Sequence, residues 1–188
     1  MIESPRTSLW RNREFNLLWG GQVLSELGDA VARFALPLLV LVLTGSAVQA
    51  GVVGTAGQVT ALVCRLPVGV LADRVDRRRA MLAADAVRLF TCGGLAALII
   101  AGQARLWVIV AVAVVDAAAG TVFGTTEQAA LRSIVPAGQL PAAVARNEAR
   151  GYGVSLAGPP LGGVLFGIGH ALPFVGNAVS YLSCGPCC

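Results

Sequence analysis

The most informative stretch of the chain reads Gly69-Val70-Leu71-Ala72-Asp73-Arg74-Val75-Asp76-Arg77-Arg78-Arg79-Ala80-Met81. Six residues within positions 73–79 are charged, and long apolar segments lie on both sides. On its own, such a run is no more than a solvated basic turn. Between apolar segments, it predicts a short hairpin loop that joins two helices at one face of a membrane.

The composition of the whole chain supports a membrane protein. Of the 188 residues, 56% are hydrophobic and only 13% are charged, whereas soluble domains average about 25% charged residues. A soluble helical core would need a polar face on each helix, and most segments here have none. At about 20 apolar residues per crossing, about six helices fit. We therefore predict an all-α membrane protein, a helical bundle of about six transmembrane helices.

The apolar segments define the expected order of elements. We expect a cytoplasmic tail over 1–14, a transmembrane bundle over 15–183 with helices over 15–43, 49–72, 80–101, 106–128, 141–169 and 171–183, and a cysteine-rich tail over 184–188. The sixth helix is too short to span a bilayer, so we expect it to be truncated and the chain to be a fragment. Pro67–Leu71 is similar to Pro160–Leu165, which favours a three-plus-three inverted repeat.

The basic residues indicate the orientation of the chain. The net charge is +4, and a basic chain can bind nucleic acid. Here, however, the arginines gather in the links between apolar segments, which the positive-inside rule explains without a nucleic-acid partner. One side holds eight arginines and the other only Arg105; the eight are Arg6, Arg11, Arg13, Arg74, Arg77, Arg78, Arg79 and Arg132. We expect a multi-pass protein of the plasma membrane with a cytoplasmic N-terminus.

The first apolar segment carries a polar face. Gln22, Glu26, Asp29 and Arg33 are spaced by four, three and four residues, so they share one side of a helix. Asp116 interrupts another apolar segment. Charges at membrane depth usually face a bundle interior or a wet cavity, which makes these five residues candidates for substrate binding or proton coupling. The alternative is a face near the membrane interface that simply contacts water.

Each of these carboxylates needs a partner, water or a proton, because an unpaired charge in lipid is costly. We expect Asp29 to pair with Arg33, and Asp85 to pair with Arg88 three residues later. A carboxylate that alternates between a protonated and a charged form would supply the chemistry that proton antiport requires. Glu26 and Asp29 are the candidates for that role.

The hairpin resembles the signature that major facilitator superfamily transporters carry between their second and third helices. Asp76 replaces a glycine of that signature and Arg78 replaces a lysine; Gly69, Leu71, Ala72, Asp73, Arg74, Arg77 and Met81 match it. A motif of the fifth helix, frequent in antiporters, is matched in part by Gly158, Pro159, Gly162 and Gly163. In the fourth-helix motif, by contrast, Asp116 stands where an arginine is expected. The opening of the chain resembles drug and siderophore exporters.

The resemblance implies the N-terminal half of a secondary transporter, an efflux antiporter that is driven by protons and carries a small-molecule substrate through the lipid bilayer. Such transporters bind substrate between two halves, so it also implies a missing C-terminal half or a partner subunit, without which the chain is inactive. The alternative is a non-transporting six-helix membrane protein that binds or modulates a partner.

No sequence feature indicates an enzyme. The chain lacks the pattern of a Ser/His/Asp triad, a phosphate-binding loop or a metal-ligand cluster, so we predict no catalytic residue, cofactor or metal. Cys184-Gly185-Pro186-Cys187 has the spelling of a thioredoxin active site. That chemistry needs a helix that begins at the first cysteine on a βαβ scaffold, and the role of Cys184, Cys187 and Cys188 stays open.

The resemblance further implies that the hairpin is a gate between two global states. We expect Asp73 to meet a helix N-terminus or an arginine, Arg77 or Arg78 to reach Glu127, and Gly69 to allow close approach of a neighbouring helix. The full set of expected gating residues is Gly69, Leu71, Asp73, Arg74, Arg77, Arg78 and Glu127.

Replacing Asp73 tests the gate. We expect Asp73→Asn to abolish transport in the full-length protein because the charge that stabilises one state is lost, while membrane insertion is unchanged. Transport assays combined with quantification of the inserted protein check this, and unchanged transport would contradict a gating role.

Overall fold

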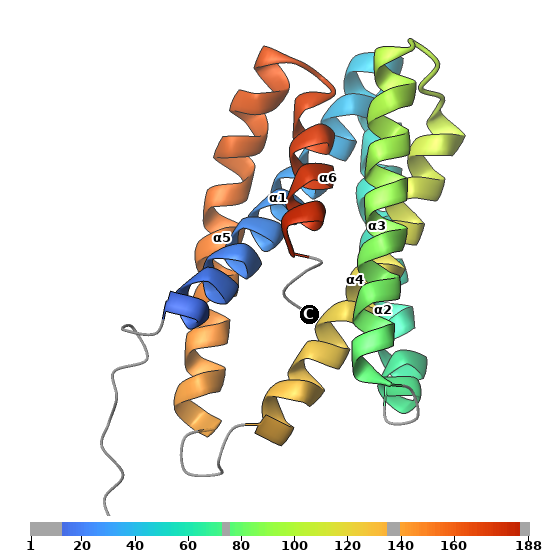
Figure 1. Ribbon diagram of the computed structural model, residues 1–188. Coiled ribbons are helices and arrows are strands. Elements are labelled where there is room, and N and C mark those ends of the chain that lie inside the picture. The colour runs from blue at the N-terminus through green and yellow to red at the C-terminus, as the bar shows by residue number, and fades with distance from the viewer. Residues whose placement is uncertain (1–12, 73–75, 135–139, 185–188) are drawn as a thin grey trace, which may run out of the picture.

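The computed structural model describes residues 13–72, 76–134 and 140–184 (Figure 1). These residues form six α-helices and no strand: α1 (Arg13–Thr44), α2 (Ala47–Ala72), α3 (Arg77–Ile100), α4 (Leu106–Ile134), α5 (Leu140–Ile168) and α6 (Leu172–Cys184). The predicted all-helical fold class is confirmed. Helix α4 continues beyond the expected end at 128, because apolar content marks the limit of a membrane span and not the end of a helix.

Four helices are long and apolar enough to cross a membrane by themselves. Their spans are Gln22–Thr44, Ala47–Gly69, Arg78–Ile100 and Leu106–Ala129. Helices α5 and α6 meet this criterion only together, as a pair bent by 120°. Helix α5 contains Pro159 and Pro160 in its interior together with several glycines, and α6 has 13 residues. The described residues therefore hold four or five candidate spans.

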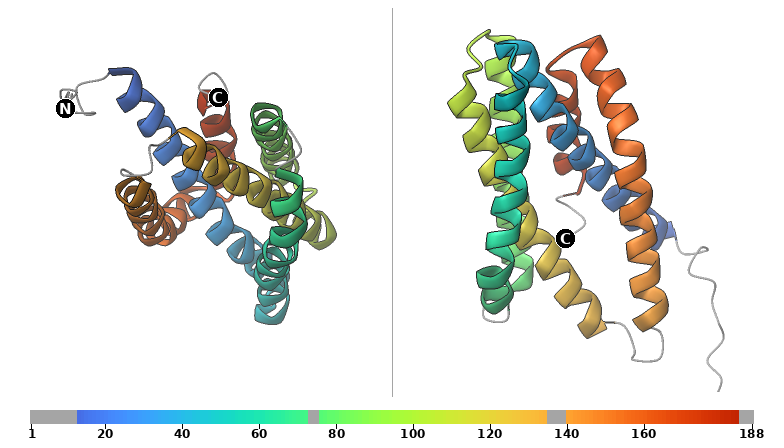
Figure 2. Two further views of the ribbon diagram at one scale, coloured as in Figure 1. Left: turned by 90° about the horizontal axis from the view of Figure 1, so that it is seen from below. Right: turned by 180° about the vertical axis from the view of Figure 1, so that it is seen from behind.

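Helix α1 runs obliquely through the middle of the bundle (Figures 1 and 2). It packs against α5 and α6 on one side and against α2 on the other, while α4 packs against α2 and α3. Helix α6 lies between α1 and α3. The turns that follow α1, α3 and α5 all lie at one end of the bundle, at the top of Figure 1, so consecutive helices run in opposite directions.

The helix ends have clear local causes. Gly45 and Gly102 follow α1 and α3 with φ of +66° and +68°, a conformation that glycine adopts without steric cost. At the opposite end, the carboxylate of Asp76 caps α3 by accepting the backbone N–H of Arg78 at 3.1 Å, as N-cap aspartates do. Asp76 stands where the hairpin signature has a glycine, and its structural role here is to cap α3.

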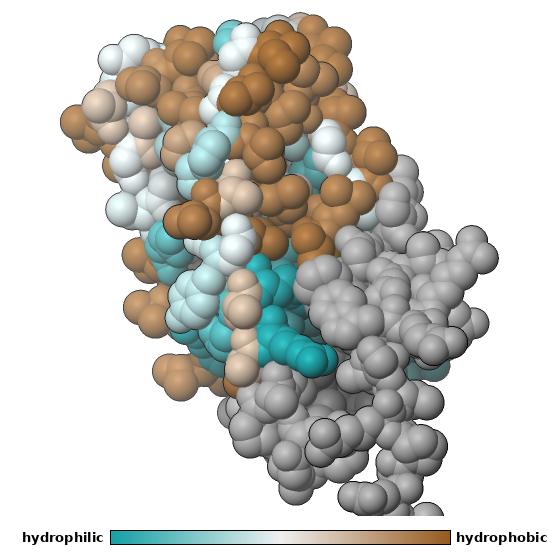
Figure 3. Space-filling model, turned by 90° about the vertical axis from the view of Figure 1, so that its left-hand side faces the viewer, coloured by the Kyte–Doolittle hydropathy of each residue, from teal (hydrophilic) through white to brown (hydrophobic). Residues whose placement is uncertain are grey.

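Polarity is distributed as a bilayer requires. Large apolar side chains point outward; the most exposed include Leu66 at 81%, Trp107 at 79% and Leu156 at 82%. On the face shown in Figure 3, apolar side chains predominate in the upper part and hydrophilic ones gather lower down. The interior instead buries charged groups: Asp29, Asp85, Arg88, Asp116 and Arg150. Intramembrane charges that face the bundle interior follow the usual rule for membrane proteins.

An apolar core lies at the end of the bundle where α1 turns into α2. It includes Leu39 and Val53 from α1 and α2, Leu95 and Ile109 from α3 and α4, and Phe174 from α6. The buried charges lie on the parts of the helices that are more distant from that turn. The core therefore closes one end of the bundle, and the polar site lies beneath it.

Helices α1 and α5 approach closely at the fifth-helix motif. A Cβ added to Gly158 would lie 2.6 Å from the Cβ of Ala30, and one added to Gly162 would lie 3.2 Å from Phe34 Cδ1. Glycines allow such contacts between membrane helices. Gly69 differs from our expectation: a Cβ there would meet no described atom within 4 Å, so the expected close approach is not observed.

Adding one methyl group at Gly158 should destabilise the bundle. We expect Gly158→Ala to lower the free energy of unfolding by about 1–3 kcal/mol, because overpacking forces the two helices apart. Unfolding in detergent, followed by circular dichroism, measures this change. The matched control is Gly163→Ala, where an added Cβ meets nothing within 4 Å; equal losses in both variants would contradict the expectation.

Candidate functional site

A cleft of about 1120 Å³ opens between α1, α2 and α4. Its wall combines apolar side chains such as Phe34 and Phe123 with polar and charged ones. The five residues expected to bind substrate or couple protons all line it: Gln22, Glu26, Asp29, Arg33 and Asp116. Arg88 of α3 also reaches the wall. The structure thus brings the expected residues together, and their functional role stays a prediction.

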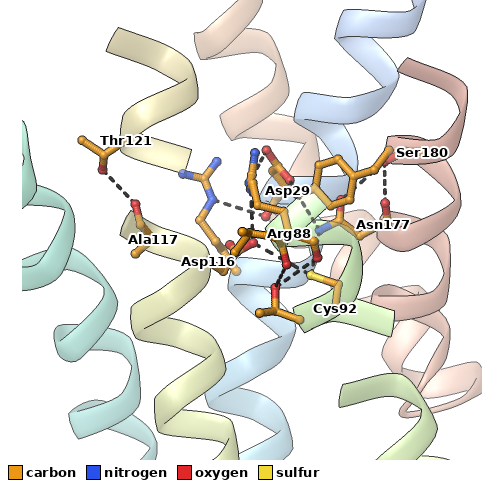
Figure 4. A network of polar contacts seen from close by, with 12 residues as sticks. Asp29, Arg88, Cys92, Asp116, Ala117, Thr121, Asn177 and Ser180 are labelled. Carbon is orange, nitrogen blue, oxygen red and sulfur yellow. Dashed lines mark hydrogen bonds and ion pairs between the residues drawn. The ribbon is translucent and has the colours of Figure 1, made fainter. Parts of the chain in front are cut away.

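Arg88 forms the centre of a buried ion network beside this cleft (Figure 4). Its Nη2 lies 2.6 Å from Oδ2 of Asp29, and its Nε donates to Oδ1 of Asp116 at 3.2 Å. The hydroxyl of Tyr181 donates to the other oxygen of Asp29. The guanidinium carbon also lies 4.9 Å from the centre of the Tyr181 ring, within the range of a cation–π contact.

A second layer of side chains supports the network. Asn177 of α6 donates to Sγ of Cys92 at 3.6 Å and to the hydroxyl of Tyr181 at 3.3 Å. The thiol of Cys92 in turn lies 3.9 Å from the Asp116 carboxylate. Gly28 makes room for Asn177, because an added Cβ would lie 2.6 Å from its Oδ1. Helices α1, α3, α4 and α6 therefore meet at one polar point.

Arg150 of α5 forms a second bridge. Its Nη2 lies 2.6 Å from Oε1 of Glu26 and 2.9 Å from Oε1 of Glu127, while Nη1 donates to Gln22 at 2.8 Å. This arginine side chain is only 4% exposed. Among the described residues, α4 and α5 otherwise scarcely pack against each other, so the ion pair with Glu127 is their main connection.

Both arginines share one arrangement. Each lies between a carboxylate of α1 and a carboxylate of α4, so two negative charges surround one positive charge. Such a bridge depends on every partner, because removing one member of a buried ion pair typically costs about 3–5 kcal/mol. Each bridge thus holds one more carboxylate than arginine.

Two expected pairings are wrong. Arg33 does not pair with the Asp29 carboxylate; its Nε donates to the backbone carbonyl of Asp29 at 3.2 Å. The expected Asp85–Arg88 pair is replaced by the contacts of Arg88 with α1 and α4. Charge-assisted bonds inside the bundle are stronger than a pair within one helix, which is worth only about 0.2–0.5 kcal/mol.

The gating expectations are settled only in part. Glu127 pairs with Arg150, not with Arg78, whose side chain is exposed. Asp73 and Arg74 lie outside the described residues, as do the side chains of Leu71 and Arg77 and the tail after Cys184. Among the described residues, no group of three or more His, Cys, Asp or Glu is placed to hold a metal ion.

Sequence reasoning missed the residues that organise the site. Arg88 and Arg150 had no assigned role in the site, and Asn177 and Tyr181 were not considered. A usable signal was present for the two arginines, because an ionisable residue within a membrane span indicates a functional site by default. For Asn177 and Tyr181, only their place in the second half of a short apolar helix gave a hint.

Comparison with known proteins identifies a family. A family model described as "transmembrane secretion effector", within the major facilitator superfamily, matches residues 5–184. Among curated proteins, none matches the chain significantly. The match covers all six helices and both arginine bridges.

Removing the central arginine should destabilise the protein. We expect Arg88→Met to lower the free energy of unfolding by about 3–5 kcal/mol, because two buried carboxylates lose their cation. Arg33→Met is the control and should cost less than about 1 kcal/mol, since Arg33 is exposed and contacts a carbonyl. Adding Asp29→Asn and Asp116→Asn to Arg88→Met should recover stability. Denaturation in detergent measures the free energy of unfolding of the two single variants and the triple variant. Equal losses of stability in the two single variants would contradict the network.

Proposed function

The chain belongs to the transmembrane secretion effector family of the major facilitator superfamily, and on this premise we propose that it exports a small molecule in exchange for protons. The family consists of membrane transporters, not enzymes, and the chain is a multi-pass membrane protein. The observation that carries the proposal is the cleft of about 1120 Å³, lined by charged residues within apolar helices. A polar cavity of this kind inside a membrane bundle serves to pass a solute.

The cleft wall supports an amphipathic substrate. Phe34, Leu36 and Phe123 offer apolar contact, and Gln58 and Thr121 offer hydrogen-bonding groups. A few polar groups on an apolar wall are typical of small-molecule sites. The five expected residues Gln22, Glu26, Asp29, Arg33 and Asp116 contribute to the same wall, and we propose that they contact the substrate or its coupling proton.

The direction of export rests on orientation. The arginine asymmetry of the links supports a cytoplasmic N-terminus in the plasma membrane. In that orientation the apolar core around Leu39 and Val53 lies at the external end, and the charged cleft lies on its cytoplasmic side. This arrangement favours loading from the cytoplasm, as efflux requires.

Transporters of this superfamily place the substrate between two halves of about six helices each. The six described helices correspond to one such half. We propose that a second six-helix unit completes the cleft, carried either on the same polypeptide or by a partner subunit. The hairpin residues Gly69, Leu71, Asp73, Arg74, Arg77 and Arg78 would act at that junction, where they stabilise one of the two states.

Dye extrusion tests the proposal. Cells that express the full protein are loaded with the cation ethidium or the anion carboxyfluorescein, and loss of fluorescence is followed with and without a proton uncoupler. We expect at least one dye to leave at least about tenfold faster than from cells without the protein, and the uncoupler to abolish the difference. A tenfold change in rate corresponds to about 1.4 kcal/mol of activation free energy.

Matched arginine variants sharpen this assay. Arg150→Gln should abolish extrusion, because it releases Glu26 and Glu127. Arg79→Gln makes the same chemical change at a side chain that is 87% exposed, and should preserve extrusion. If neither dye leaves faster than from control cells, the result favours a membrane protein that binds a partner without transport.

A further inference from the structure

Asp85 is a buried carboxylate for which the described residues supply no hydrogen bond or ion pair. It lies on α3, one turn before Arg88, and is only 7% exposed. Its Oδ2 has no hydrogen-bond partner within the described part of the chain. A charged oxygen in that position is costly, and an ionisable residue inside a membrane span indicates a function. Asp85 therefore needs a ligand that supplies positive charge.

The groups around Asp85 hold more carboxylates than cations. Asp85 interacts electrostatically with Arg88 and Asp29, but Arg88 is already bonded to Asp29 and Asp116. Three further titratable groups contact Asp29 or Asp116 and not Asp85 itself: Arg33 from α1, Cys92 from α3 and Tyr181 from α6. Of these, Arg33 directs its Nε to a backbone carbonyl. Three carboxylates thus share one arginine at this point.

A proton fits this position better than a metal ion. Hard metal cations take about six or more oxygen ligands, and the described residues contain no group of three or more His, Cys, Asp or Glu that could hold a metal. A proton needs only one oxygen. Oδ2 of Asp85 supplies one that accepts nothing else in the described chain.

Asp85 is also better suited to bind a proton than the other buried carboxylates. Asp29 and Asp116 both accept bonds from Arg88. Glu26 also has an oxygen that meets no partner among the described residues, but its other oxygen lies 2.6 Å from Arg150 and its side chain is 31% exposed. Asp85 alone among these four combines deep burial with the absence of a direct ion pair among the described residues.

We propose that Asp85 binds the proton that this transporter exchanges, and that Arg88 relays its charge to the cleft. Asp85 does not line the cleft, whereas Asp29, Arg88 and Asp116 do. When Asp85 releases its proton to water, its charge competes for Arg88 and frees a carboxylate that faces the cleft. Rebinding of a proton returns Arg88 to Asp29 and Asp116. This inference rests on the proton exchange proposed above.

Infrared spectroscopy of the full-length protein in detergent tests the site. Protonated carboxylic acids give a carbonyl band that vanishes as the pH is raised and shifts in deuterated buffer. We expect one such band in the parent protein and its complete loss in Asp85→Asn. The control Asp76→Asn should keep the band, because Asp76 is an exposed cap and asparagine caps equally well.

The alternative outcomes are distinct. A band that persists in Asp85→Asn, or that disappears in Glu26→Gln instead, would overturn the assignment. Asparagine mimics a protonated aspartate, so Asp85→Asn should fold with parental thermal stability; failure to fold would mean that the charged form is native, which also overturns it.

The infrared readout requires no transport. An Asp85-dependent band without dye extrusion would leave the proton site standing and refute the proposed export. Proton-dependent extrusion that is retained in Asp85→Asn would support export and refute the role of Asp85.

Discussion

The contact of Arg88 with Asp29 and Asp116 is the interaction on which the interior of this bundle depends. Apolar surfaces give membrane helices little reason to prefer one register, because lipid tails are as apolar as the side chains. A guanidinium that must meet two carboxylates and an aromatic ring accepts far fewer arrangements. One polar point therefore positions α1, α3, α4 and α6, and the wall of the cleft follows from their placement.

The two arginine bridges differ in how readily they can open. Around Arg88 the carboxylate side chains are 12% and 9% exposed, whereas around Arg150 they are 31% and 18% exposed. Water weakens an ion pair that it can reach. The Arg150 bridge also joins two helices with little other contact in the described chain. The outer bridge is thus suited to break when helices move apart, whereas Arg88 of the inner bridge can exchange carboxylate partners while its helices stay packed.

Sequence reasoning succeeded for features that depend on a single helix. Apolar runs predicted the all-helical fold, and spacing along one segment predicted that Glu26, Asp29 and their neighbours share a face. It failed for pairings, since local rules offered Asp29–Arg33 and Asp85–Arg88 while the actual partners lie on other helices. It failed at Gly69 for the same reason, because close approach depends on the neighbouring helix.

Helix α6 carries a consequence for biogenesis. Its buried face bears Asn177, Ser180 and Tyr181, groups that are costly to leave alone in lipid. Ser180 bonds to Asn177 within α6, but Asn177 and Tyr181 find partners on α3 and α1, which emerge from the ribosome earlier. The segment therefore gains little from partitioning into the bilayer by itself. Its insertion is best understood as docking onto a partly assembled bundle that has already organised its charges.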